Sequence, residues 1–209
     1  MIAILIAATI IAAPATPQQR LAEYITKRRP NAEPYAGKLA RAIVREAKRV
    51  RLDPAALAAV AWVESRFDRR ARGSAQEYGL WQLIRTDYRM AASWARLRPN
   101  ATPWRKLPRA AVIGALRDVD VSAYLAADEL AGVRAWCRRA GHRISSRWIA
   151  PRWVLGPDGV HRLHGGRRAH AQEIDRLAHH QSGPRWPLRG YTRALRAEYR
   201  RIQRVIRGR

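Results

Sequence analysis

The chain has 209 residues, enough for one domain with a sizeable hydrophobic core and too few for two ordinary domains. It carries 41 Lys and Arg against 16 Asp and Glu, a net charge of +25, so its surface attracts polyanions such as nucleic acid, anionic lipid or acidic envelope polymers. Charge alone selects no partner, because an arginine-rich chain also places arginine on solvated faces. The single cysteine, Cys137, excludes an internal disulfide.

The N-terminal residues predict an export signal. Residues 2–12 read IAILIAATIIA, an uncharged apolar run, and Ala13-Pro14-Ala15 follows it as a signal-peptidase site. The run is shorter than the roughly 20 apolar residues that a transmembrane helix needs. We therefore expect residues 1–15 to be a signal peptide and the mature protein to be periplasmic or extracellular.

Hydrophobic periodicity predicts helices along most of the remaining chain. An N-terminal arm or short basic helix occupies residues 16–35, and Pro30 interrupts it. The further predicted helices lie at 36–50, from Asp53 to about Phe67, from about 86 to 97, over 109–139 as one long helix or two, and near 167–180 and 189–206. No strand-rich region stands out, so the predicted class is mainly α.

The helix that begins at Asp53 carries one carboxylate on its apolar stripe. Glu64 lies four residues after Val60 and seven after Leu57, so it shares their face. A carboxyl group there pairs with a cation, binds a metal or faces a cleft, and burial raises its pKa so that it holds a proton near neutral pH. Glycosidic-bond cleavage uses such a carboxyl as a general acid. A structural ion pair with one of the many arginines is the alternative.

Two short motifs around this glutamate form a signature. ESRF at 64–67, a loop of small and polar residues, and GLWQL at 79–83 resemble the E-S-x-F … G-L-M-Q-[IL] signature of the soluble lytic transglycosylase catalytic domain, a relative of goose-type lysozyme. The resemblance covers residues 58–88 directly. It implies a lysozyme-like single helical domain over residues 36–180. The Gly- and Ser-containing composition of residues 68–81 predicts a loop with a small β-hairpin after the catalytic helix. An apolar stripe surrounded by arginines predicts a basic C-terminal helix within residues 181–209.

The resemblance also implies an activity. Glu64 would be the single general acid/base of a monomeric, cell-wall-associated enzyme that cleaves peptidoglycan glycan strands without cofactor or metal. It would protonate the oxygen that joins N-acetylmuramic acid to N-acetylglucosamine, then accept a proton from the muramic C6 hydroxyl as this closes a 1,6-anhydro ring. Gln82 matches a substrate-contacting family glutamine, and Ser65 matches a serine that supports the site. A loop-stabilising amide and a helix-end hydroxyl are the alternatives.

Two departures from the family pattern bear on the reaction. Glu77 places a second acid beside the proposed cleft. If its carboxylate lies roughly 6.5–9.5 Å from that of Glu64, Glu77 would activate water and make the enzyme an inverting, lysozyme-like muramidase. If Glu77 points to solvent or to an arginine, the transglycosylase reaction is unchanged. The nearest match to the family's A-Y-N-x-G motif is RLHGG at 162–166, which lacks the Tyr and Asn. We expect His164, Tyr88 or Tyr78 to supply the missing polar group.

A tryptophan, a histidine pair and the final helix can each be interpreted in more than one way, and so can the function. Trp81 is either a sugar-stacking wall or a core residue. His161 and His164 form an H-x-x-H pair without the further ligands of a zinc site, so we expect no metal. The final helix either docks on the catalytic domain and shows its arginines to envelope polymer or membrane, or is a solvated surface helix. The second functional class is a non-catalytic basic protein that binds polyanions or glycan, and the export signal argues against nucleic acid as its normal partner.

Overall fold

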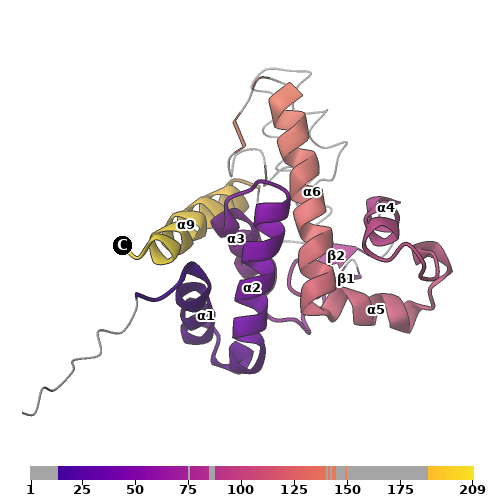
Figure 1. The fold of residues 1–209 in the computed structure, drawn as a ribbon, viewed down its shortest axis with the longest axis horizontal. Helices are drawn as coiled ribbons and strands as arrows, with labels where there is room; N and C mark the ends of the chain where they lie inside the picture. Colours follow the sequence, from indigo (N-terminus) through magenta and orange to yellow (C-terminus); the bar gives the residue numbers. More distant parts are fainter. Residues whose placement is uncertain are drawn as a thin grey trace, which may run out of the picture.

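The computed structural model describes residues 14–74, 76–84, 88–139, 141, 143–144, 149 and 188–209. This part of the chain is mainly helical, which confirms the predicted class. Its elements, drawn in Figure 1, are α1 (Pro17–Arg28), η1 (Pro30–Ala32), α2 (Glu33–Arg49), α3 (Pro54–Ser65), β1 (Glu77–Tyr78), β2 (Leu83–Ile84), α4 (Tyr88–Leu97), η2 (Trp104–Lys106), α5 (Arg109–Arg117), α6 (Val119–Arg139) and α9 (Leu188–Arg207). The two strands form an antiparallel hairpin after α3, as predicted.

Some predicted features lie outside the described residues. They are most of the export signal, the helix near 167–180 and the histidines of the H-x-x-H pair. Within the described ranges, no helix has the length and apolar character needed to cross a membrane. The same ranges hold no cluster of three metal-binding side chains. The domain boundaries drawn from the sequence stay predictions.

Helix α3 lies at the centre of the molecule. Asp53 caps its first turn by accepting a hydrogen bond from the Ala55 amide at 2.9 Å, and Pro54 occupies the first helical position, where no amide hydrogen is needed. All residues from 55 to 61 are buried, because α2, α6 and α9 pack around the helix. The helix ends at Arg66, whose left-handed backbone (φ 55°) turns the chain toward the hairpin.

The long apolar stripe over 109–139 forms two helices. The break falls at Asp118, whose extended backbone ends α5. Its Oδ1 then accepts hydrogen bonds from the amides of Asp120 (3.0 Å) and Val121 (2.9 Å), which caps α6. The carboxylate thus satisfies amides that a continuous helix would have bonded internally.

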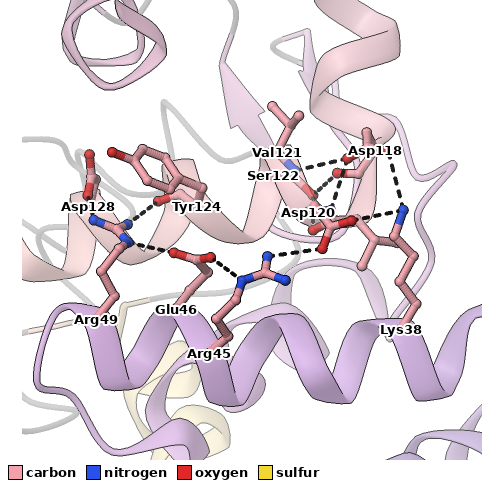
Figure 2. A network of polar contacts seen from close by, with 11 residues as sticks. Lys38, Arg45, Glu46, Arg49, Asp118, Asp120, Val121, Ser122, Tyr124 and Asp128 are labelled. Carbon is pink, nitrogen blue, oxygen red and sulfur yellow. Dashed lines mark hydrogen bonds and ion pairs between the residues drawn. The ribbon is translucent and has the colours of Figure 1, made fainter. Parts of the chain in front are cut away.

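Acidic and basic side chains alternate along the seam between α2 and α6 (Figure 2). Lys38 and Arg45 each approach Asp120 at 3.0 Å, and Arg49 approaches Asp128 at 2.8 Å. The buried Glu46 adds a further acceptor on α2. These three cations of the seam are therefore balanced locally by acids.

Helix α9 docks on the domain, as the first of the two alternatives for the final helix expected, while contact of its arginines with envelope polymer or membrane stays a prediction. Figure 1 shows it beside α3 and α1. The Tyr199 hydroxyl and the Gln203 amide each donate a hydrogen bond of 2.9 Å to Asp53, at the start of α3. Tyr191, near the start of α9, contacts Glu64 near the end of α3, so the two helices run antiparallel.

Candidate active site

Glu64 occupies the last turn of α3, where the helix leaves the core. Unlike the fully buried residues earlier in the helix, Glu64 is partly exposed. Its Oε1 accepts a hydrogen bond of 2.5 Å from the Tyr191 hydroxyl, which α9 brings from 127 positions further along the chain. Two elements that are far apart in sequence therefore form the site.

The surroundings of Glu64 keep a proton on it. Although the residue as a whole is partly exposed, burial of the carboxyl group raises its pKa from 4.5 to about 8. The Tyr191 hydrogen bond acts in the opposite direction and lowers this pKa, while the negative charge of Glu77 raises it. No described lysine or arginine pairs with Glu64, so the ion-pair alternative is not what this part of the structure shows. At pH 7 the carboxyl group is mostly protonated, the state that a general acid requires.

Tyr191 is suited to remain a hydrogen-bond donor. Burial, the first cause, and the charge of Glu64 raise its pKa well above the usual value of 10, so the hydroxyl keeps its proton throughout the physiological range. A neutral donor aimed at a carboxyl oxygen stabilises the carboxylate more than the acid. Tyr191 therefore favours the state that Glu64 reaches after giving up its proton.

Two hydrogen bonds fix the hairpin segment against α3, one at its last residue and one in its first half. The Ser65 hydroxyl lies within hydrogen-bond distance of two carbonyl oxygens, 3.0 Å from that of Ala61 and 2.8 Å from that of Leu80. The Trp81 indole donates to the carbonyl of Leu57 at 2.9 Å and is fully buried. Ser65 thus joins helix to hairpin. Trp81 takes the core alternative, with no exposed ring face on which a sugar could stack.

The side chains of Glu77 and Gln82 converge over Gly73. A Cβ atom at position 73 would lie 2.1 Å from Glu77 Oε2 and 2.9 Å from Gln82 Oε1, so a larger residue there would displace both side-chain ends. The Gln82 amide is partly exposed and donates to the carbonyl of Gly79 at 2.9 Å. Since the charge of Glu77 also raises the pKa of Glu64, the hairpin brings its acid and its amide to the neighbourhood of Glu64.

None of the residues expected to replace the family's missing tyrosine is seen in contact with Glu64 in the described part of the structure. Tyr78 is buried, and its hydroxyl accepts a hydrogen bond of 3.3 Å from Arg109 on α5, which is the largest cause of its lowered pKa. His164 and the side chain of Tyr88 lie outside the described residues. The contact with Glu64 comes from Tyr191, which the sequence analysis missed. The Gly-Tyr-Thr run at 190–192 has the small–Tyr–polar order of the family's Ala-Tyr-Asn and is the signal that could have found it.

These features define a mainly helical structure in which one acid of the described residues, Glu64, holds a proton at neutral pH. Residues 41–106 match the family model described as Transglycosylase SLT domain, which confirms the resemblance seen in the sequence. The match covers less than half of the chain but contains α3 and the hairpin, and Tyr191 lies beyond it. The family consists largely of lytic transglycosylases, enzymes that act on peptidoglycan. No curated protein and no solved structure matches the chain.

Proposed function

We propose that the protein is an exported peptidoglycan lytic transglycosylase, with Glu64 as its general acid/base. The observation that carries this proposal is the pKa of about 8 for the buried carboxyl group of a partly exposed glutamate within the matched segment. A structural glutamate of an arginine-rich protein would be expected in an ion pair. A protonated carboxyl group beside a neutral hydroxyl is instead suited to proton transfer.

The reaction needs one group that first gives and then takes a proton. Protonated Glu64 donates to the oxygen of the β-1,4 bond between N-acetylmuramic acid and N-acetylglucosamine, and the bond from that oxygen to the muramic C1 breaks. The resulting carboxylate, stabilised by Tyr191, accepts the proton of the muramic C6 hydroxyl while its oxygen bonds to C1. The products are a free 4-hydroxyl on N-acetylglucosamine and a 1,6-anhydro ring. No water is added, and Glu64 regains its proton.

Tyr191→Phe is expected to move the alkaline limb of the pH–rate profile to higher pH. The Tyr191 hydrogen bond lowers the pKa of Glu64, so its removal raises that pKa and keeps the acid protonated at higher pH. At pH 7 we expect kcat/KM to fall about tenfold, because the carboxylate formed in the first step loses its donor. The measurement is the rate of glycan cleavage from pH 5 to 10.

Tyr199→Phe is the matched control for that variant. It removes a hydroxyl from the same helix, but one that donates to Asp53 instead of Glu64. We expect a lower melting temperature and an unmoved alkaline limb. Equal pH profiles for Tyr191→Phe and the wild type would contradict the assigned role of Tyr191.

A second candidate reaction is hydrolysis, because Glu77 lies close enough to influence the pKa of Glu64. Under our proposal, Glu77→Gln keeps anhydro products, and its alkaline limb moves to lower pH because a like charge is removed. Mass analysis of the products and a pH profile measure both effects. Glu23→Gln, which changes an exposed acid on α1, serves as the control. Reducing ends that are present in the wild-type digest and absent from the Glu77→Gln digest would establish a muramidase instead.

Digestion of purified peptidoglycan by the mature protein tests the proposed function itself. Fragments ending in anhydro-muramic acid support a transglycosylase, and reducing muramic ends identify a muramidase. Binding without any fragment, under conditions in which the protein is folded, would identify a non-catalytic glycan-binding protein and overturn the proposal.

A further inference from the structure

The arginines of α9 differ from those of the α2–α6 seam in how they are balanced. The only acid on α9, Glu198, is buried and accepts hydrogen bonds from Tyr24 on α1 and from Arg201. Among the described residues, Arg201 alone of the exposed arginines of α9 has an ion-pair partner. These exposed arginines are Arg193, Arg196, Arg200, Arg201, Arg204 and Arg207. The outer face of this helix therefore concentrates positive charge.

A cleft between α1 and the last turns of α9 gathers further cations. Its volume is about 580 Å³, and Figure 1 shows the two helices side by side. Within the described part of the chain, Glu23 is the one acid that lines it. The lining cations are Arg20, Lys27, Arg28, Arg201 and Arg209.

Several of these cations are held in place by the domain. The Arg20 guanidinium donates to the carbonyl of Ile206 through Nε (3.1 Å) and Nη2 (2.6 Å). Buried Glu198 holds Arg201 at 3.0 Å and Arg28 at 3.7 Å. Because the fold positions these groups, an arriving anion does not have to order them, which lowers the entropic cost of binding.

We propose that the α1–α9 cleft binds a phosphodiester-linked polyol chain, an anionic polymer of the cell envelope. A group of cations, three of them positioned guanidinium groups, suits repeated phosphates, because each phosphate takes charge-assisted hydrogen bonds from such donors. The cleft is lined by two helices, and exposed arginines of α9 also lie outside its lining, so a linear chain can contact more of these cations than a single small anion can.

The structure disfavours a membrane as the partner. Membrane-surface helices insert an apolar face, but α9 buries Tyr191, Leu195 and Ile202 against the domain. Across the described residues, the one large exposed hydrophobic side chain is Ile84, which lies on the hairpin. Electrostatic attraction alone would then have to hold the protein on lipid.

A single-stranded nucleic acid is disfavoured by the lack of a stacking surface. Such ligands gain much of their affinity by stacking bases on exposed aromatic rings. The one aromatic residue lining the cleft is Tyr24, which is buried and bonded to Glu198. The cleft offers charge without stacking, as a polyol phosphate requires.

The cleft extends from Arg28, whose guanidinium lies 4.1 Å from the centroid of the Trp62 ring, to Val205, and its Val205 end lies well away from Glu64 along α9. Fourteen positions separate Tyr191 from Val205 in the cleft lining, which is about 20 Å of helix. A chain held at the Val205 end therefore leaves the glycan site open. Binding there would hold the protein on an anionic wall independently of catalysis.

Titration of a fluorescent poly(glycerol phosphate) chain of defined length, at increasing NaCl, tests the proposal. The double variant Lys27→Ala/Arg209→Ala removes two exposed cations from the cleft that have no ion-pair partner within the described ranges. We expect about tenfold weaker binding at 0.15 M salt and a salt slope reduced by roughly one to two units. The matched control, Arg105→Ala/Lys106→Ala, removes the same charge from exposed positions on η2 and should weaken binding less than about threefold.

Each of the other outcomes would overturn the proposal that the cleft binds this polymer. Equal losses in both double variants would show a diffuse charge effect, and absence of binding at 0.15 M salt would exclude the site. Tighter binding to a single-stranded nucleic acid with the same number of phosphates, or to vesicles of anionic phospholipid, would identify a different partner. Circular dichroism checks the fold. We expect both double variants to cleave short glycan fragments that carry no polymer at the wild-type rate. Failure of the proposed polymer binding is therefore distinguishable from failure of the proposed function.

Discussion

Glu64→Gln is expected to reduce glycan cleavage at least about 10³-fold while leaving the fold intact. The amide has nearly the shape of the acid and still offers an oxygen to the Tyr191 hydroxyl, so the contact between α3 and α9 survives. It has no proton to donate to the glycosidic oxygen and cannot accept one from the C6 hydroxyl. Turnover on purified peptidoglycan is the measurement, with Glu23→Gln as an exposed-acid control that keeps full activity.

The same substitution has an expected effect on stability. Because the pKa of Glu64 is raised from 4.5 to about 8, the folded state binds the proton more tightly than the unfolded state between these values. The wild type therefore loses stability as the pH rises through this window. Glu64→Gln lacks that loss, so its melting temperature should exceed that of the wild type by a margin that grows between pH 5 and 9. A constant margin, or an active variant, would contradict the assigned environment of Glu64.

Gly79→Ala is expected to destabilise the protein by about 2–4 kcal/mol and to reduce activity strongly. Gly79 has φ +78°, a left-handed conformation that strains other residues, and an added Cβ would lie 2.1 Å from the carbonyl oxygen of Leu116. Relief of that clash would move the hairpin away from α5. Glu77 and Gln82 would move with it, so activity should fall even where the variant remains folded.

Gly114→Ala is the matched control for this prediction. Gly114 lies within α5, and nothing lies within 4 Å of the position of an added Cβ. Alanine there should be neutral or stabilising by about 0.5–1 kcal/mol, because it restricts the unfolded chain and favours the helix. Chemical denaturation of both variants, together with glycan cleavage, measures the difference. A Gly79→Ala variant as stable as Gly114→Ala would refute the close approach of the hairpin to α5.

Local patterns predicted the parts of the site that are close in sequence. The helical period placed Glu64 on α3, and the loop composition after it predicted the hairpin that carries Gln82. Tyr191 could not be found in this way, because its contact with Glu64 depends on how α9 docks 127 positions away. Periodicity defines the faces of a helix, but it does not identify the partner of each face.

Sequence also left open which polar and aromatic residues face inward. Trp81 next to Gln82 could equally have lined a sugar site, and only the packing of the hairpin on α3 shows that it is buried. The apolar stripe over 109–139 continues through Asp118, so its period gave no reason to choose two helices over one. The net charge likewise gave no position, whereas the structure separates the balanced α2–α6 seam from the arginines of α9.

Digestion of peptidoglycan in heavy-oxygen water, with wild type and Glu64→Gln in parallel, tests the central claim most directly. We predict that the wild type releases anhydro-muramic fragments that contain no heavy oxygen, since the C6 hydroxyl of the sugar is the nucleophile, and that Glu64→Gln releases none. Fragments that carry heavy oxygen at the muramic C1, or anhydro fragments from Glu64→Gln at the wild-type rate, would contradict the account.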